Sequence, residues 1–198
     1  MFKNELRTAF KQQRLALDAA IHNQLSLQIA QSVLQVINFQ DFDALHCYLP
    51  IPKFAEINTV LLLNKIKERF PNYPVFVPKI SADGQHLHHY VWQSDRATQI
   101  NKWGIPEPLA NEQTPQHLPE RMVVFVPLLA FDINGHRVGY GKGFYDKFLQ
   151  TLGSKTLKVG LSFFEAVSPI SDLNPYDQAL DCCITPKQVY NFGDVKKS

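Results

Sequence analysis

The stretch MVVFVPLLAFDINGHRVGYGKGFYDKF, residues 122–148, joins an apolar run to a glycine-rich loop and then to a helical segment. Residues 122–129 are nearly all apolar, which is typical of a strand that a parallel sheet buries on both faces. The segment from about residue 143 to residue 152 is expected to form a helix. The stretch therefore predicts a strand, a loop and a helix in succession, the unit from which α/β sheets are built.

The same alternation extends in both directions along the chain. We expect helices over residues 3–16, 19–37 and 57–69, and strands over residues 44–50, 75–80, 86–92, 158–163 and 180–185. Residues 101–120 hold several prolines and no periodicity, so a long loop or linker is expected there. The order predicts one α/β domain over residues 1–198, in three layers (α/β/α) around a largely parallel sheet.

Composition and charge exclude several classes of protein. The 20 basic residues nearly balance the 18 acidic ones, so no broad basic surface is available for nucleic acid. No apolar run approaches the roughly 20 residues that span a bilayer, and the N-terminus lacks an apolar signal segment. An odd number of cysteines, namely Cys47, Cys182 and Cys183, favours a reducing compartment. We expect a cytoplasmic monomer whose partners are small molecules.

Four of the 9 glycines lie close together between the predicted strand and helix: Gly135, Gly139, Gly141 and Gly143. Backbone amides in such a loop favour a bound phosphate, and Lys142 adds a positive charge. The loop is not a Walker A motif, because GKG lacks a following Ser or Thr, and it lacks the spacing of a dinucleotide fingerprint. The alternative is a glycine-rich turn that binds no ligand.

Two carboxylates are candidates for a metal site. Asp146, in the first turn of the predicted helix, either caps backbone amides or holds a magnesium ion that bridges nucleotide phosphates. Asp181 lies at the start of the last predicted strand, directly before CCIT, and would converge on the same ion, unless it is an ordinary surface residue.

Four basic residues, Lys3, Arg7, Lys11 and Arg14, share one side of the first predicted helix. A stripe of this kind is usually a solvated face. With a nucleotide nearby, the Arg7 guanidinium would instead bind a phosphate.

Other candidates have a plain structural interpretation beside the functional one. Glu56 suits the N-terminus of the helix that follows it, where the helix dipole stabilises a negative charge. Trp103 is either a core residue or a planar surface for a ring. Strand alternation separates His89 from His86 and His88, which favours surface histidines over a metal cluster.

Several separate segments together resemble the 5-formyltetrahydrofolate cyclo-ligase family, also called methenyltetrahydrofolate synthetases. The most specific is residues 127–149, with a Phe-Asp, an Arg-x-Gly-x-Gly-x-Gly and an aromatic-Tyr-Asp. The supporting segments are KNELR (3–7), YLPIPKFAEINT (48–59), VPKI (77–80), WGIPEP (103–108) and LDCCITP (180–186). The resemblance spans nearly the whole chain, and the segments occur in the family's order.

The resemblance implies ATP-dependent cyclisation of 5-formyltetrahydrofolate to 5,10-methenyltetrahydrofolate, with magnesium as the metal. Its ATP-binding positions correspond to Lys3, Asn4, Glu5, Leu6, Arg7, Arg137, Val138, Gly139, Tyr140, Gly141, Lys142, Gly143, Phe144 and Tyr145. Its folate-binding positions correspond to Ile51, Glu56, Trp103, Tyr140, Gly141, Lys142, Gly143 and Phe144. Asp146 and Asp181 would hold magnesium, and Lys142 and Arg7 would act on the transferred phosphate.

Two other functions fit parts of this pattern. The family's fold resembles that of sugar-phosphate isomerases and CoA transferases, so either activity on the same scaffold is an alternative. Neither needs ATP, and the combination of Lys3, Arg7 and Asp146 argues against both. A protein that binds folate or nucleotide without turnover is the non-enzymatic alternative.

Overall fold

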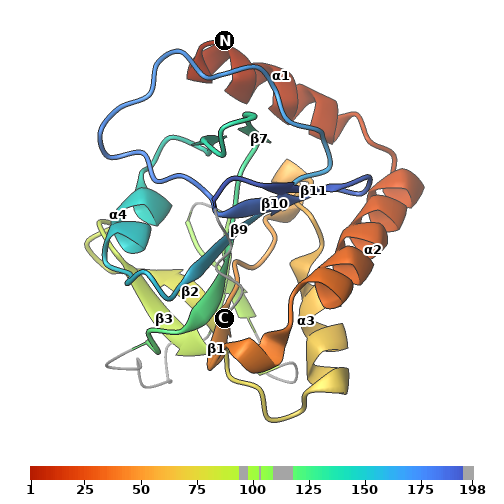
Figure 1. The fold of residues 1–198 in the computed structure, drawn as a ribbon, viewed down its shortest axis with the longest axis vertical. Helices are drawn as coiled ribbons and strands as arrows, with labels where there is room; N and C mark the ends of the chain where they lie inside the picture. The colour runs from red at the N-terminus through yellow and green to blue at the C-terminus, as the bar shows by residue number, and fades with distance from the viewer. Residues whose placement is uncertain (94–97, 103, 109–117, 194–198) are drawn as a thin grey trace.

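A sheet of seven strands runs through the molecule in the order β11-β10-β9-β6-β1-β2-β3. The computed structural model describes residues 1–93, 98–102, 104–108 and 118–193. The strands of this sheet are β1 (Ala44–His46), β2 (Val75–Ile80), β3 (Leu87–Val91), β6 (Met122–Val126), β9 (Leu157–Leu161), β10 (Cys182–Ile184) and β11 (Val189–Asn191). The α-helices of the described ranges are α1 (Lys3–Leu15), α2 (Ala19–Val36), α3 (Thr59–Arg69) and α4 (Phe144–Gln150) (Figure 1).

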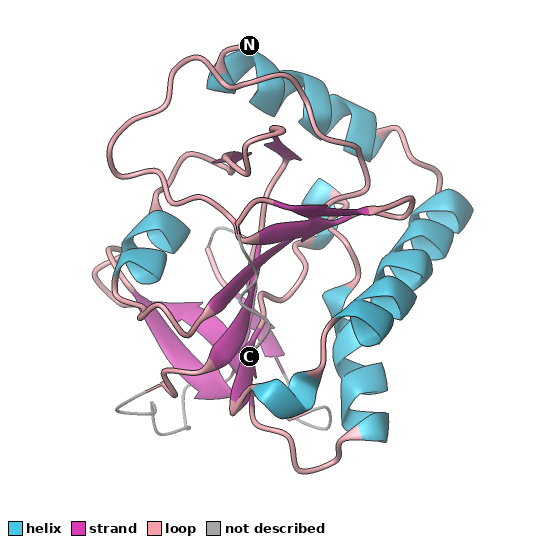
Figure 2. Cartoon of the chain, in the orientation of Figure 1, coloured by secondary structure: helices cyan, strands magenta, loops and turns pink. Residues whose placement is uncertain are grey.

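The sheet is largely parallel, which confirms the prediction. Every neighbouring pair from β2 through β1, β6 and β9 to β10 is parallel. The edge strands β3 and β11 are antiparallel to their neighbours (Figure 2). Strand β11 is absent from the sequence prediction, which ended the sheet at β10, because three residues are too short to show a period.

Alternate residues along the strands contribute to two separate hydrophobic cores. Leu45 and Val123 point to a core that α2 and α3 cover, while Ala44 and Val124 point to a second core beneath α4. In Figure 1 the helices α2 and α3 flank one side of the sheet and α4 the other. Both faces are therefore covered, as a parallel sheet of apolar strands requires.

Two predicted segments differ from the structure. The expected loop at residues 101–120 contains β5 (Pro106–Pro108), which pairs antiparallel with β4 (Thr98–Ile100). The side chain and carbonyl of Asn101 accept hydrogen bonds from the Ile105 and Gly104 amides, at 3.0 and 2.9 Å, and this turn closes the hairpin. The strand expected at residues 44–50 ends at His46, where the chain leaves the sheet towards the 3-10 helix η2 (Pro52–Phe54).

Helix α1 packs across a small β-hairpin that leads into the glycine loop. Strands β7 (Ala130–Phe131) and β8 (Arg137–Val138) form this hairpin, and each is too short to predict. Leu6 and Phe10 of α1 pack in one buried cluster with Ala130 and Val138. The N-terminal helix is thereby fixed beside a loop more than a hundred residues away in the sequence (Figure 1).

The cysteines Cys47, Cys182 and Cys183 are all buried and free. Across the described ranges, no helix combines the length and the apolar character needed to cross a membrane.

Candidate active site

A cavity of about 680 Å³ lies where α1, the segment after β1 and the glycine loop meet. Its volume is typical of a small-molecule site. Most of the predicted site residues line it: Lys3, Arg7, Ile51, Glu56, Arg137, Gly139, Tyr140, Gly141, Lys142, Gly143, Phe144, Tyr145 and Asp146. The fold thus brings three distant segments of the sequence to one place.

The other predicted residues that the structure describes do not line this cavity. Leu6 and Val138 are buried in the cluster beneath α1, where they support the site from behind. The Glu5 carboxylate accepts from the Phe2 amide at 3.1 Å and so caps α1, and the Asn4 side chain accepts from Arg7. Trp103 lies outside the described residues.

The glycine loop exposes its backbone to the cavity. Gly141 and Gly143 adopt left-handed backbone angles, with φ of +85° and +72°, which glycine adopts without steric cost. Gly139 has no such angle, and a Cβ added to it would meet no atom within 4 Å. The fold therefore does not require glycine at position 139. Close approach of a ligand to the backbone at this position would require it.

The basic face of α1 is built into the site. Lys3 and Arg14 are only 8% and 5% exposed, so the interpretation of this stripe as a solvated face is wrong for both. Lys3 forms an ion pair with Asp177, and the Arg7 Nε donates to the Gly139 carbonyl at 3.0 Å. The geometry fixes Arg7 against the glycine loop.

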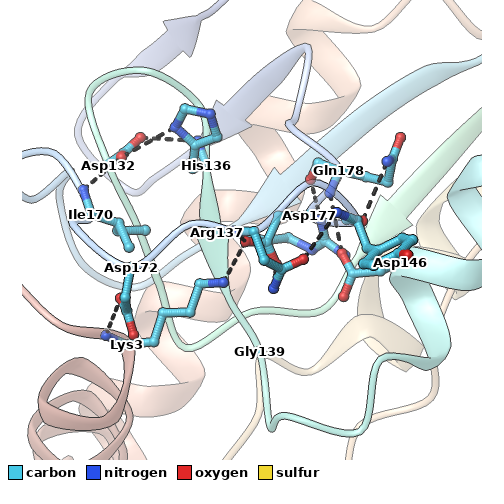
Figure 3. Close-up of polar contacts among 12 residues, drawn as sticks. Lys3, Asp132, His136, Arg137, Gly139, Asp146, Ile170, Asp172, Asp177 and Gln178 are labelled. Carbon is cyan, nitrogen blue, oxygen red and sulfur yellow. Dashed lines mark hydrogen bonds and ion pairs between the residues drawn. The ribbon is translucent and has the colours of Figure 1, made fainter.

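Asp146 is held by a buried arginine on the preceding strand (Figure 3). Its Oδ1 accepts from the Arg137 Nη2 at 2.7 Å and from the Gln178 amide at 3.2 Å. Burial lowers the pKa of Arg137, and the Asp146 charge acts in the opposite direction. Both hydrogen bonds use Oδ1, and the side chain, which lines the cavity, is 29% exposed.

Asp181 lies elsewhere. Its Oδ2 accepts from the Lys158 amide at 2.7 Å, and its Oδ1 is 3.6 Å from the Lys158 Nζ. It does not line the cavity that Asp146 lines. Among the residues that the structure describes, no three His, Cys, Asp or Glu side chains cluster as metal ligands would. A role for Asp181 in metal binding stays a prediction.

Glu56 is a buried carboxylate in the cavity wall, with 4% exposure. Its Oε1 accepts from the Tyr140 hydroxyl at 2.6 Å and its Oε2 from the Ile51 amide at 2.7 Å. Burial raises its pKa, although these hydrogen bonds and the Arg14 charge act in the opposite direction. Helix α3 begins later, with the Asn58 side chain as its cap, so the interpretation of Glu56 as a helix-terminal charge is wrong.

Phe54 and Asp177 are among the cavity-lining residues that the sequence analysis did not assign to the site. The Phe54 ring stacks on the Tyr140 ring, with centroids 5.0 Å apart and planes inclined by 25°. Asp177 lines the cavity and accepts from Lys3 and from the Asn174 amide, the latter at 2.7 Å. The sequence signal for Phe54 was its position inside residues 48–59, a segment that resembles the family, whereas Asp177 lies outside all of these segments.

The predicted separation of the histidines is confirmed, but the expectation that they are surface histidines is wrong for His89. His86 and His88 are exposed, whereas the His89 Nδ1 lies 3.0 Å from the Nε2 of the fully buried His46. Burial lowers the pKa of both His46 and His89. The imidazoles therefore form a neutral pair beneath α4 rather than a set of metal ligands.

A model of the 5-formyltetrahydrofolate cyclo-ligase family matches residues 1–186. The chain belongs to this family. The cyclo-ligase relatives include a probable 5-formyltetrahydrofolate cyclo-ligase of Schizosaccharomyces pombe, 28% identical over 201 residues that cover 94% of this chain and 96% of the relative. The 5-formyltetrahydrofolate cyclo-ligase of Haemophilus influenzae is 29% identical, over 81% of this chain and 85% of its own.

The fold of this cyclo-ligase family member also matches solved structures. The 5,10-methenyltetrahydrofolate synthetase of Aquifex aeolicus is similar with a TM-score of 0.79 and 26% identity, over 100% of this chain and 96% of the other. The synthetase of Mycoplasma pneumoniae, at 23% identity and a TM-score of 0.72, shares the fold. The expected likeness to sugar-phosphate isomerases and CoA transferases stays a prediction.

Proposed function

We propose that the chain catalyses the ATP-dependent cyclisation of 5-formyltetrahydrofolate to 5,10-methenyltetrahydrofolate, with release of ADP and phosphate. One observation carries this proposal. Basic residues of α1, a glycine loop with open backbone and a buried carboxylate all line one cavity. A phosphate-binding surface and an acceptor for ring N–H donors therefore adjoin, as a reaction between ATP and a folate requires.

The nucleotide phosphates would lie against the glycine loop and α1. Arg7 already bonds to the Gly139 carbonyl, so its guanidinium stands beside the loop with donors left for a phosphate. Lys142 is exposed at the tip of the loop and is free to follow the transferred group. In phosphoryl transfer the protein mainly positions groups and neutralises charge, which these residues suit.

The folate would place its pterin ring near Glu56 and Ile51. An ionised carboxylate offers about four lone-pair positions, and the Tyr140 hydroxyl and the Ile51 amide occupy two of them. Two positions thus remain for donors of a bound ring. The apolar side chains of Ile51 and Phe54 add surface for a flat ligand.

The reaction needs activation because a formyl amide is a poor electrophile. In the proposed sequence, the formyl oxygen attacks the γ-phosphorus and the bond to ADP breaks. The amine of the aminobenzoyl arm then adds to the formyl carbon and loses its proton. The carbon–oxygen bond breaks last, and phosphate leaves with that oxygen. No step requires a covalent enzyme nucleophile, and Arg7 and Lys142 would neutralise the charge that develops on the phosphate.

Asp146 is the residue that fits magnesium. Magnesium is usually held by one or two carboxylates together with waters and substrate phosphates. A single, partly exposed carboxylate that lines the cavity meets this need. When bound, magnesium would neutralise phosphate charge, while Arg137 keeps the Asp146 side chain in place.

The test is to mix the protein with 5-formyltetrahydrofolate, ATP and magnesium and to follow the near-ultraviolet band of the methenyl product together with ADP release. Equal amounts of product and ADP are expected. Binding of both ligands without any band would favour the non-catalytic alternative. Failure to bind either ligand would refute the proposal, and turnover of a sugar phosphate or a CoA thioester would replace it.

A further inference from the structure

A chain of hydrogen bonds links α1 to the wall of the cavity. Arg14 is buried, and its Nε and Nη1 donate to the Phe54 and Leu128 carbonyls at 2.7 and 3.3 Å. Its Nη2 donates to the Tyr140 hydroxyl. That hydroxyl in turn donates to the Glu56 Oε1 at 2.6 Å. A buried cation thus reaches a buried carboxylate through one hydroxyl group.

We propose that Arg14 is a positioning residue, which orients the Glu56 carboxylate and keeps it ionised through the Tyr140 hydroxyl. The inference rests on the proposed function in one respect, namely that Glu56 receives the ring of the folate. The structural part concerns only the state of Glu56 in the free protein.

Charge balance supports this role. Within the described ranges Arg14 has no direct ion pair, and its other two acceptors are neutral carbonyls. An unpaired charge in a protein interior is costly. The Tyr140 hydroxyl accepts from the cation and donates to the anion, so each bond polarises the other. Burial by itself raises the pKa of Glu56, and the hydroxyl and the cation together oppose that rise.

Packing fixes the hydroxyl independently of these bonds. The Tyr140 ring stacks on Phe54, and the Arg14 guanidinium carbon lies 5.7 Å from the centre of the same ring. A phenylalanine at position 140 would keep the ring and remove only the linking oxygen. Other titratable groups also face Glu56: His22 from α2, whose Nε2 is 2.8 Å from the Glu56 carbonyl, Tyr48 after β1, and Tyr145 on α4.

Because several groups titrate nearby, the experiment measures the protonation of the Glu56 carboxyl group directly. The carbon-13 shift of its carboxyl group, assigned with Glu56→Gln, is followed from about pH 4 to about pH 8 in the full chain. Tyr140→Phe should raise the midpoint by about one pH unit or more, a tenfold gain in proton affinity. An unchanged midpoint in Tyr140→Phe would overturn the proposal.

Arg14→Met tests the other end of the chain. It should also raise the midpoint, and the double variant should show no more than the larger single shift, because the chain is already broken. Additive shifts would show that Arg14 does not act through Tyr140. Arg14→Met also leaves the Phe54 and Leu128 carbonyls without a donor, so Tyr140→Phe decides the matter if that variant fails to fold.

Ligand binding supplies the second measurement. Affinity for 5-formyltetrahydrofolate, without nucleotide, should depend less on pH in the unmodified chain than in Tyr140→Phe between about pH 6 and about pH 8. In Tyr140→Phe it should fall with decreasing pH, because a protonated Glu56 loses acceptor capacity. An equal loss at every pH would mean that Tyr140 only contacts the ligand, and would refute the positioning role.

Tyr190→Phe is the matched control, because the Tyr190 hydroxyl also donates to a glutamate, Glu165, at 2.9 Å, and does not line the cavity. It should leave both measurements unchanged. Absence of folate binding in the unmodified chain, with the midpoint of Glu56 shifted as expected in Tyr140→Phe, would defeat the proposed function alone. Normal binding with an unmoved midpoint would defeat the positioning role alone.

Discussion

The substitution Gly139→Ala distinguishes the requirement of folding from the requirement of nucleotide binding at position 139. The added methyl group meets no atom within 4 Å, and the backbone at this position is not left-handed. Alanine at such a site usually stabilises by about 0.4–1 kcal/mol, because it restricts the unfolded chain. For a chain of this size that corresponds to a rise in Tm of roughly 1–4 °C.

Nucleotide binding should change in the opposite direction. The methyl group would stand where the loop backbone faces the cavity, in the space that we assign to the phosphates. We expect the affinity for ADP, measured by calorimetry, to fall by about tenfold or more, which equals a loss of about 1.4 kcal/mol or more.

Gly143→Ala provides the comparison. Its Cβ also meets no atom within 4 Å, but a φ of +72° disfavours alanine, at a cost of about 1–2 kcal/mol. Its Tm should fall, whereas that of Gly139→Ala should not. A stable Gly139→Ala that binds ADP like the unmodified chain would refute the assignment of phosphates to this loop.

Three further predictions concern charge. Asp146→Asn should abolish the magnesium dependence of turnover. Asp181→Asn, which breaks contacts with Lys158, should leave that dependence nearly intact, and equal effects of the two substitutions would support Asp181 as a magnesium ligand. Lys142→Met should lower kcat for the cyclisation by about tenfold or more with little change in folate affinity. Lys155→Met removes an exposed ion pair with Glu120 and should change neither kcat nor affinity. An equal loss of kcat and affinity in Lys142→Met would contradict the role assigned to Lys142. Burial lowers the pKa of His89 from 6.5 to about 4 and that of His46 as well, so the unfolded chain binds protons first and stability should decline as pH falls from about 6.5 towards 4. Urea denaturation at several pH values would show this decline, His89→Gln should reduce its slope, and a stability that does not vary across that window would disprove it.

The fold was predictable where the pattern is local. The apolar run of β6 and the glycines that follow it indicate a strand and a tight loop without knowledge of any distant contact. Strand β11 and the hairpin of β7 and β8 have three residues or fewer per strand, so neither length nor period indicates them. They form because neighbouring strands supply hydrogen-bond partners.

The site was predictable in its residue types but less so in their environments. Helical spacing grouped Arg14 with other basic residues, but its burial depends on carbonyls 40 and 114 positions away in the sequence. Asp181 shows the same limit, because its partner Lys158 lies 23 positions earlier. A sequence pattern specifies which side chains share a face, whereas tertiary contacts decide which of those faces are buried.

The packing of α1 has a consequence for biosynthesis. Apart from the Phe54 carbonyl, the groups described above that hold this helix lie between the Leu128 carbonyl and Asp177, and they are translated long after it. At about 5–20 residues per second, α1 leaves the ribosome on the order of ten seconds before its partners. During that interval Leu6 and Phe10 have none of the apolar neighbours of their final cluster that lie between Leu129 and Ile170. The nascent chain therefore presents the apolar face of an amphipathic helix, and substitutions that make this face more apolar would raise the risk of aggregation during synthesis.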